Sequence, residues 1–200
     1  MVHPDTELRF INQTMGHGVF ATRYIPKGTI TWVRDNFDQT FKPGEVKLME
    51  PAYQKILEDY SYVDARGMIV LCWDHARYFN HSCAANCLAG GYDFELAIRD
   101  IRAGEELTDD YGTLNLRKNL SCACGLASCR KLILPDDMER LSDHWDSNIK
   151  EVFPLIPAVK QPLWPLLKEK KEVEQALKSP SQLRSIRCNY APECAFTFYI

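Results

Sequence analysis

The spacing of four cysteines is the feature that most constrains the fold of this 200-residue chain. Cys122, Cys124 and Cys129 stand within eight residues, and Cys83 directly follows the run Asn80-His81-Ser82. Structural zinc takes four ligands in a tetrahedron, and thiolates are among the ligands it prefers. The spacing therefore indicates one zinc site that ties two distant segments together, with Cys83 as the candidate fourth ligand.

The other four cysteines are expected to be free thiols: Cys72, Cys87, Cys188 and Cys194. Cys188 and Cys194 alone would be an incomplete ligand set for a second metal. The amino terminus lacks a basic start followed by an apolar stretch, which disfavours secretion and a disulfide framework. No run is long enough to cross a bilayer. We expect an intracellular protein, cytoplasmic or, in a eukaryote, nuclear, and leave the oligomeric state open.

Composition indicates a globular protein, and the net charge disfavours binding to nucleic acid. The chain is 46% hydrophobic and 26% charged, which is typical of a globular protein with one main core. The net charge is -3, and no block of like charges is long enough to serve as a nucleic-acid arm. Direct binding to nucleic acid or to a membrane is therefore not expected.

Hydrophobic patterning predicts short strands followed by a helical tail. Residues 8–33 alternate short apolar stretches with Gly and Pro, 67–73 is typical of a buried strand, and 93–101 alternates like a half-buried strand. A short helix is expected over Pro51–Asp59. After Cys129, apolar residues recur at helical spacing from Pro135 and again over 165–178, interrupted by prolines.

Two short motifs are weak signals when each is taken alone. Gly16-His17-Gly18 fits a turn that needs positive φ, although it would also let a backbone approach a bulky ligand. Asn80 alone could simply stabilise a turn through its side-chain amide. His81 alone could be a buried histidine whose ring nitrogens have hydrogen-bond partners.

Taken in order, the motifs are far more specific. The run 77–87, Arg-Tyr-Phe-Asn-His-Ser-Cys-Ala-Ala-Asn-Cys, is followed by 104–112, Gly-Glu-Glu-Leu-Thr-Asp-Asp-Tyr-Gly, and then by Cys-x-Cys-Gly-x3-Cys-Arg. This series resembles SET-domain protein lysine methyltransferases that carry a post-SET zinc segment. The resemblance covers roughly residues 8 to 130.

The resemblance implies a mainly β SET-domain fold, with small curved sheets forming a β-clip, and a helical tail. In this fold a threaded segment, a pseudoknot, brings the Asn-His segment beside the Asp-Tyr segment. The expected organisation is a SET domain over 1–114, with a variable insert at about 34–73, a post-SET zinc segment over 115–130, and a helical C-terminal extension over 131–200.

The resemblance also implies the site residues. S-adenosylmethionine would be held by Gly16, His17, Gly18, Arg77, Asn80, His81, Tyr111 and Leu126. Tyr111 would be the catalytic tyrosine, and one structural Zn²⁺ would be bound by Cys83, Cys122, Cys124 and Cys129. Tyr111 taken alone would fit a core tyrosine equally well.

The chain departs from the family at Asp109, where members usually carry Phe or Tyr. This position lines the lysine channel and influences how many methyl groups are added. A carboxylate there could bind the incoming ammonium, but it would also stabilise the charged, unreactive amine. We expect Asp109→Phe to change the ratio of mono-, di- and trimethylated product, unless Asp109 turns outward to solvent.

The sequence thus predicts an S-adenosylmethionine-dependent enzyme that methylates the ε-amine of a protein lysine, on a histone or another basic protein. The alternative is a catalytically weak SET-like module that binds protein partners through its helical tail. Retention of Asn80, His81 and Tyr111 favours the enzyme, whereas Asp109 keeps the alternative open. A module that binds zinc and nucleic acid is disfavoured by the net negative charge of the chain.

Overall fold

The computed structural model describes residues 1–191. Cys194, which was predicted to be a free thiol, lies outside the described residues, as does the end of the predicted 131–200 extension. Within the described part, the strands form one four-stranded sheet, two three-stranded sheets and one two-stranded ribbon, and the last strand is followed only by helices and 3₁₀ turns. The predicted mainly β fold with a helical C-terminal region is confirmed.

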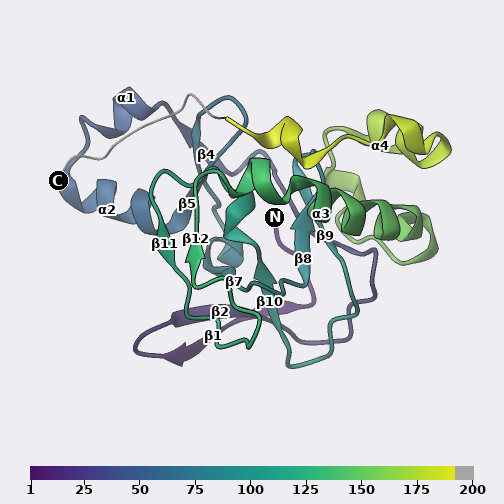
Figure 1. The fold of residues 1–200 in the computed structure, drawn as a ribbon, viewed down its shortest axis with the longest axis horizontal. Helices are drawn as coiled ribbons and strands as arrows, with labels where there is room; N and C mark the ends of the chain where they lie inside the picture. Colours follow the sequence, from purple (N-terminus) through teal and green to yellow (C-terminus); the bar gives the residue numbers. More distant parts are fainter. Residues whose placement is uncertain (192–200) are drawn as a thin grey trace.

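The four-stranded sheet joins segments that are far apart in the sequence. Its strands, in spatial order, are β1 (Thr6–Asn12), β2 (Gly16–Ala21), β10 (Glu106–Asp109) and β7 (Asn80–His81). β1 and β2 form a hairpin, β10 pairs antiparallel with β2, and β7 runs parallel to β10. The sheet therefore sets the Asn-His segment directly beside the strand that leads to Tyr111 (Figure 1).

The remaining strands form antiparallel sheets. They are β3 (Ile30–Val33), β9 (Phe94–Ala97) and β8 (Cys87–Ala89) in one sheet, β4 (Gln39–Phe41), β6 (Ile69–Leu71) and β5 (Ser61–Val63) in another, and the ribbon of β11 (Leu120–Ser121) and β12 (Leu132–Ile133). Helices α1 (Pro43–Val46) and α2 (Pro51–Tyr60) precede β5. A proline begins α2, where its missing N–H costs no hydrogen bond, and α2 matches the predicted helix to within one residue.

The C-terminal region contains α3 (Asp137–Val152) and α4 (Lys170–Lys178). The short 3₁₀ turns of the chain are η1 (His75–Tyr78), η2 (Tyr111–Thr113), η3 (Phe153–Ala158), η4 (Trp164–Leu166), η5 (Pro180–Gln182) and η6 (Ile186–Asn189). The second helix is shorter than the predicted 165–178, because the backbone is extended at Leu167. α3 and α4 lie at the end of the molecule opposite α1 and α2 (Figure 1). No helix in residues 1–191 is long and apolar enough to cross a membrane.

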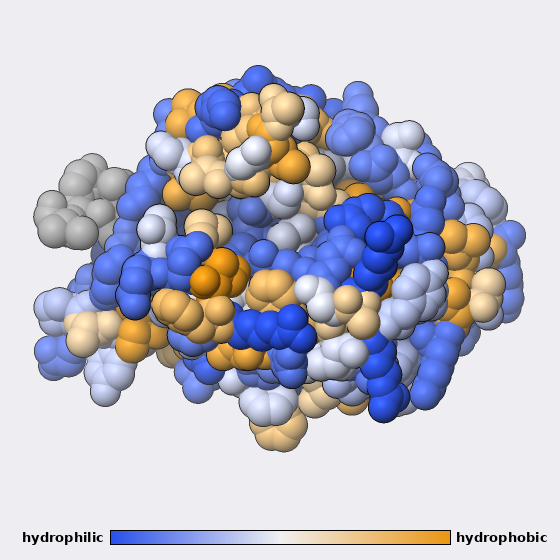
Figure 2. Space-filling view, turned by 90° about the horizontal axis from the view of Figure 1, so that it is seen from below, coloured by the Kyte–Doolittle hydropathy of each residue, from blue (hydrophilic) through white to orange (hydrophobic). Residues whose placement is uncertain are grey.

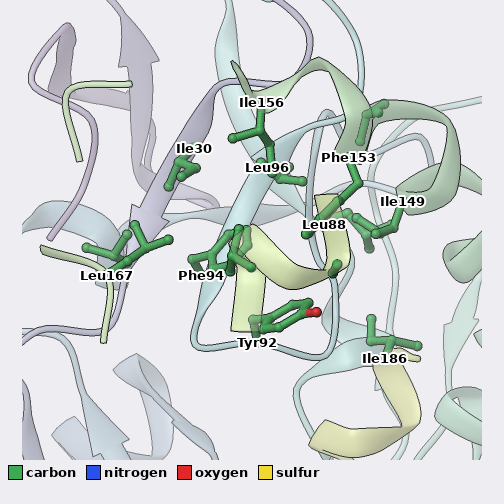
Figure 3. Packing of buried hydrophobic residues seen from close by; sticks show 14 of the residues in the cluster. Ile30, Leu88, Tyr92, Phe94, Leu96, Ile149, Phe153, Ile156, Leu167 and Ile186 are labelled. Atoms are coloured by element: carbon green, nitrogen blue, oxygen red, sulfur yellow. The ribbon is translucent and has the colours of Figure 1, made fainter. Parts of the chain in front are cut away.

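The surface on the β1/β2 side is mainly hydrophilic, with apolar residues in small groups (Figure 2). Beneath the surface, α3, η3 and α4 bury their apolar faces against the sheet that contains β9. Phe94 and Leu96 pack with Ile149, Phe153 and Ile156 in one core (Figure 3). The tail therefore packs on the strands, as expected for helices that need burial.

A strand forms inside the predicted range 93–101, but the predicted length and half-buried character were wrong. β9 covers only Phe94–Ala97, and all four of its residues are buried. One face meets the helical core, while Ala97 on the other face belongs to a second core with Trp32 and Cys87. Because both faces are covered, the charged residue in this strand, Glu95, is also buried.

Candidate functional site

Asn80 links β7 to the β1/β2 hairpin. Its amide nitrogen donates to the carbonyl oxygen of His17 at 3.0 Å and to Oε1 of Glu106 at 2.7 Å. Gly18 packs tightly against the same groups, since a Cβ there would lie 2.3 Å from Glu106 Oε1 and 3.0 Å from Asn80 Nδ2. Gly16 has a φ of +73°, which glycine adopts without strain. The structure thus brings the Gly-His-Gly turn and Asn80 together.

His81 links the same strand to Tyr111 and to a cysteine. The backbone N–H of Tyr111 donates to His81 Nδ1 at 3.1 Å, and the two ring centroids lie 5.5 Å apart. Nε2 of His81 lies 3.4 Å from Cys83 Sγ. Burial lowers the pKa of His81, so the imidazole is neutral at pH 7. Because Nδ1 accepts, the ring proton sits on Nε2 and points to the sulfur.

The Tyr111 hydroxyl is fixed by one hydrogen bond. It donates to the carbonyl oxygen of Phe79 at 2.6 Å. Burial, followed by the nearby carboxylates of Asp109 and Glu106, raises the pKa of Tyr111 well above its usual value. The hydroxyl therefore stays protonated, and its oxygen keeps lone pairs that can accept a further hydrogen bond.

Asp110 ties the tyrosine turn to the cysteine loop and to the tail. Its carboxylate receives a two-pronged hydrogen bond from the Arg130 guanidinium, with 3.0 Å between Nη1 and Oδ2. It also accepts from the Gly112 backbone N–H at 3.0 Å and from Trp145 Nε1 on α3 at 3.2 Å. A carboxylate held by this many donors is rigid, so it fixes the backbone on both sides of Tyr111.

The four cysteines of the sequence motif converge. The sulfurs of Cys83, Cys122, Cys124 and Cys129 all lie within 4.8 Å of one another, and Cys83 and Cys122 are 3.7 Å apart. Zinc–sulfur bonds of about 2.3 Å place tetrahedral ligands about 3.8 Å apart, so this set fits Zn²⁺. All four positions would be filled by protein, which is the arrangement of a structural site.

Backbone donors around the sulfurs favour thiolates. The N–H of Arg130 donates to Cys83 Sγ at 3.4 Å, and the N–H of Lys131 donates to Cys129 Sγ at 3.3 Å. Burial acts to raise the pKa of Cys124, but backbone donors, Cys83 first, and neighbouring thiols lower it to about 6. The deprotonated form that zinc requires is therefore favoured at Cys124, whereas burial raises the pKa of Cys83 and Cys122, so these two thiols would lose their protons on binding the metal.

A pocket of about 1280 Å³ reaches Tyr111 from the side of α2, β5 and the C-terminal region. Asp109, on β10, lines the pocket, and only 2% of this residue is exposed, so its side chain does not turn outward to solvent. Glu95, on β9, lines the same pocket and forms a side-chain hydrogen bond with Asp109. Tyr111 and a pair of carboxyl groups thus line the same pocket.

Two further predicted residues lie at the edges of the site. Arg77, in η1, donates from Nη2 to the carbonyl oxygen of Trp73 at 3.2 Å, and its buried Nε has no hydrogen-bond partner. Leu126 is half-buried in the cysteine loop, where its carbonyl oxygen accepts from the Cys129 N–H at 3.1 Å. Arg77 thus lies at the start of the 77–87 motif, and Leu126 lies within the cysteine motif.

Sequence reasoning missed three residues of the site: Glu95, Glu106 and Asp110. Glu106 and Asp110 stand inside the recognised 104–112 motif, and only their contacts reveal that they hold Asn80 and Arg130. Glu95 gave a misleading signal, because a charge in an alternating strand is usually on the solvent face. The absence of a basic residue opposite it could not be read from the sequence.

Comparison with known proteins gives one family match. The family model for the SET domain matches residues 16–112. A histone-lysine N-methyltransferase of Schizosaccharomyces pombe, H3 lysine-4 specific, is 44% identical over 62 residues, which are 28% of this chain and 7% of that protein. An H3 lysine-36 specific enzyme of the same yeast is 28% identical over 161 residues, covering 72% of this chain and 19% of its own length. The chain therefore spans less than a fifth of these relatives.

Two solved structures are similar at low identity. KRYPTONITE, in complex with mCHG DNA and SAH, is 22% identical with a TM-score of 0.43, covering 61% of this chain and 27% of that one. The methyltransferase domain of human histone-lysine N-methyltransferase SETMAR is 20% identical with a TM-score of 0.44, covering 66% and 58%.

Proposed function

The chain belongs to the SET-domain family, and from this premise we propose that it transfers methyl groups from S-adenosylmethionine to the ε-amine of a protein lysine. One observation carries the proposal: β7 and β10 pair so that Asn80 and His81 lie beside Tyr111, which lines a pocket of about 1280 Å³. The named activities of the relatives, histone-lysine methylation, support a histone or another basic protein as the substrate.

The cofactor would be held at the junction of the β1/β2 hairpin and β7. When bound, S-adenosylmethionine supplies a methyl group activated by a positively charged sulfonium. Gly16, His17 and Gly18 would offer backbone groups, and Asn80 would hold polar parts of the cofactor. His81 would contribute through its backbone, since its two ring nitrogens are engaged by Tyr111 and Cys83. The buried Nε of Arg77, which has no partner, is available to a polar group of the ligand. The missing side chain of Gly18 leaves the space in which Glu106 and Asn80 meet at this junction.

Tyr111 would align the amine for transfer. Methyl transfer is an in-line displacement, so the protein needs to position donor and acceptor and does not need a covalent nucleophile. The Phe79 carbonyl fixes the tyrosine hydroxyl, whose oxygen can accept a hydrogen bond from the amine. The hydrogen bonds that Asp110 accepts from Arg130 and from the Gly112 backbone keep the Tyr111 turn from moving during this step.

One Zn²⁺ on the four cysteines would have a structural role. The ion would tie residues 122–129 to the loop after His81, and His81 would donate to the Cys83 sulfur as an outer-sphere partner. The segment around the ribbon β11/β12 has little apolar surface of its own, so a metal clamp is a physically reasonable way to order it.

Calorimetric titration of the full chain with S-adenosylmethionine, followed by a lysine peptide array with labelled cofactor, tests the proposal. We expect binding and methyl transfer to at least one histone-derived or other basic peptide. Tyr111→Phe should bind the cofactor normally and transfer about 100-fold more slowly, because a preorganised hydrogen-bonding group is lost. Absence of both binding and transfer would instead support the catalytically weak interaction module.

A further inference from the structure

Two buried carboxyl groups meet at the inner end of the pocket. Glu95 on β9 is 7% exposed and Asp109 on β10 is 2% exposed, and their side chains are hydrogen-bonded to each other. Oδ1 of Asp109 also accepts from the Asp110 backbone N–H at 2.7 Å. Within residues 1–191, none of the ion pairs joins either carboxyl to a basic side chain. Buried acids are normally paired, so this pair lacks a cation.

The same pocket contains polar atoms that lack partners. Oε2 of Glu95, the Tyr62 hydroxyl and Trp32 Nε1 are buried, line the pocket and have no hydrogen-bond partner. Trp32 is only 8% exposed, so water does not reach most of its surface. Buried polar atoms in native proteins nearly always have partners. The orphaned atoms therefore indicate that a polar ligand group enters this end of the pocket.

The two carboxyls have different proton affinities. Burial and the charge of Asp109 raise the pKa of Glu95 well above its usual value, so Glu95 keeps its proton and donates to Asp109. Burial and the charge of Asp110 raise the pKa of Asp109 to about 7. The neighbouring Cys87 on β8 and Tyr111 in η2 stay protonated, because burial raises the pKa of both groups. Near neutral pH the pair therefore holds one proton firmly and can accept a second.

A purely structural role explains these observations less well. Well-packed apolar side chains would join β9 to β10 at no desolvation cost, and replacing buried charged groups in this way is often stabilising. A metal site is also a poor explanation, because two carboxylates are too few ligands for a protein-held cation. A positively charged ligand group that carries a proton satisfies both the missing cation and the orphaned acceptor.

We propose that Asp109 is the residue that takes the proton from the substrate's ε-ammonium, and that Glu95 positions it by a hydrogen bond. This inference rests on the proposed lysine methylation. An N–H bond of the ammonium breaks, its electron pair stays on nitrogen, and an O–H bond forms on Asp109. The nitrogen lone pair then attacks the methyl carbon of S-adenosylmethionine, and the electrons of the broken C–S bond go to sulfur. The proton on Asp109 leaves through the pocket to solvent.

Single-turnover methyl transfer as a function of pH tests the proposal on the full chain. Asp109→Asn should bind S-adenosylhomocysteine normally but react about 100-fold more slowly at pH 7. Its rate should rise about tenfold per pH unit toward pH 10, because the substrate amine then loses its proton in solution. Asp93→Asn is the matched control, since Asp93 lines the same pocket but is paired with Arg34. Its rate should stay within about twofold of wild type.

Glu95 variants separate positioning from structure. Glu95→Leu removes the hydrogen bond to Asp109, so the acid limb of the pH–rate profile should move to higher pH. Glu95→Gln keeps a donor and should restore the wild-type limb. A pH-independent loss in Asp109→Asn, or no loss at all, would overturn the proposal.

A second measurement needs no substrate. Side-chain carboxyl ¹³C NMR of the full chain, assigned with the Asp109→Asn and Glu95→Gln variants, should show one carboxyl of the pair still protonated at pH 7. If both carboxyls ionise below about pH 5, the proton-acceptor role is wrong even where methylation is observed. If the pair titrates as expected but the wild-type chain transfers no methyl group to any peptide, the proposed lysine methylation fails, and the proton-acceptor role fails with it.

Discussion

Gly18 shows how one missing side chain can determine a site. The hydrogen bond from Asn80 to Glu106 passes so close to Gly18 that a Cβ would meet both side chains. We predict that Gly18→Ala displaces the Glu106 carboxylate, breaks its bond to Asn80 and weakens S-adenosylmethionine binding about tenfold or more. Isothermal calorimetry measures this change. Gly44→Ala is the control, because a Cβ there meets nothing within 4 Å. Equal affinities for both variants would contradict the role assigned to Asn80.

At the scale of single residues, the sequence showed which cysteines come together, but it did not show which charged side chains are buried. The four cysteines and the Asn-His and Asp-Tyr motifs are local patterns, so their chemistry could be read before the fold was known. Glu95 has no such pattern. Its side chain lies on the strand face that meets the second core and Asp109 of β10, and this cover comes from segments far away in the sequence. Asp109 was singled out from the sequence and lines the pocket in the structure, but its partner Glu95 could not be found.

The cysteine loop is the element whose order depends most on an ion. Its ribbon, β11 and β12, has two residues in each strand, too few to be stable alone. We predict that the purified chain carries one zinc ion per molecule, and that a strong chelator weakens cofactor binding at least about tenfold while the main β-sheets stay folded. Elemental analysis, calorimetry and circular dichroism follow the three effects.

Cys188→Ser is the control for this element, since Cys188 is exposed and lies outside the cluster. It should keep its zinc, whereas Cys124→Ser should lose it. Cofactor binding that persists unchanged after complete metal removal would rule out the structural role proposed for the zinc ion.

Among the elements, the predicted helix over Pro51–Asp59 was accurate because proline at the start and apolar spacing agree. The strand predicted over 93–101 exists, but it is shorter and buried on both faces, whereas an alternating pattern indicates only one covered face.

For the whole molecule, the helical tail is part of the domain core. Helix α3 packs on β8 and β9, and Trp145 reaches the Asp110 carboxylate beside the tyrosine turn. The sequence could predict that the tail's apolar stripe needed burial, but not which surface would cover it. The hydrogen bond from Trp145 to Asp110, at 3.2 Å, is one of the links between the last third of the chain and the site.

Truncation after Arg130 should therefore give insoluble protein. Removing the helices uncovers six buried residues of the strand region: Ile30, Val33, Leu88, Tyr92, Phe94 and Leu96. Each large apolar side chain contributes about 1.5–3 kcal/mol when buried, and a whole domain is stable by only about 5–15 kcal/mol. The loss is thus comparable with the total stability. Solubility and circular dichroism of the truncated chain check this outcome.

Point variants within α3 test the same packing in a chain that still folds. Ile149 is 1% exposed in the shared core, so Ile149→Ala should lower the free energy of unfolding by about 2–5 kcal/mol in urea titration. The exposed neighbour Lys150 is the matched control, and Lys150→Ala should change it by less than about 0.5 kcal/mol. A soluble truncated chain that unfolds cooperatively, together with a silent Ile149→Ala, would mean that the strands form a stable core without the tail.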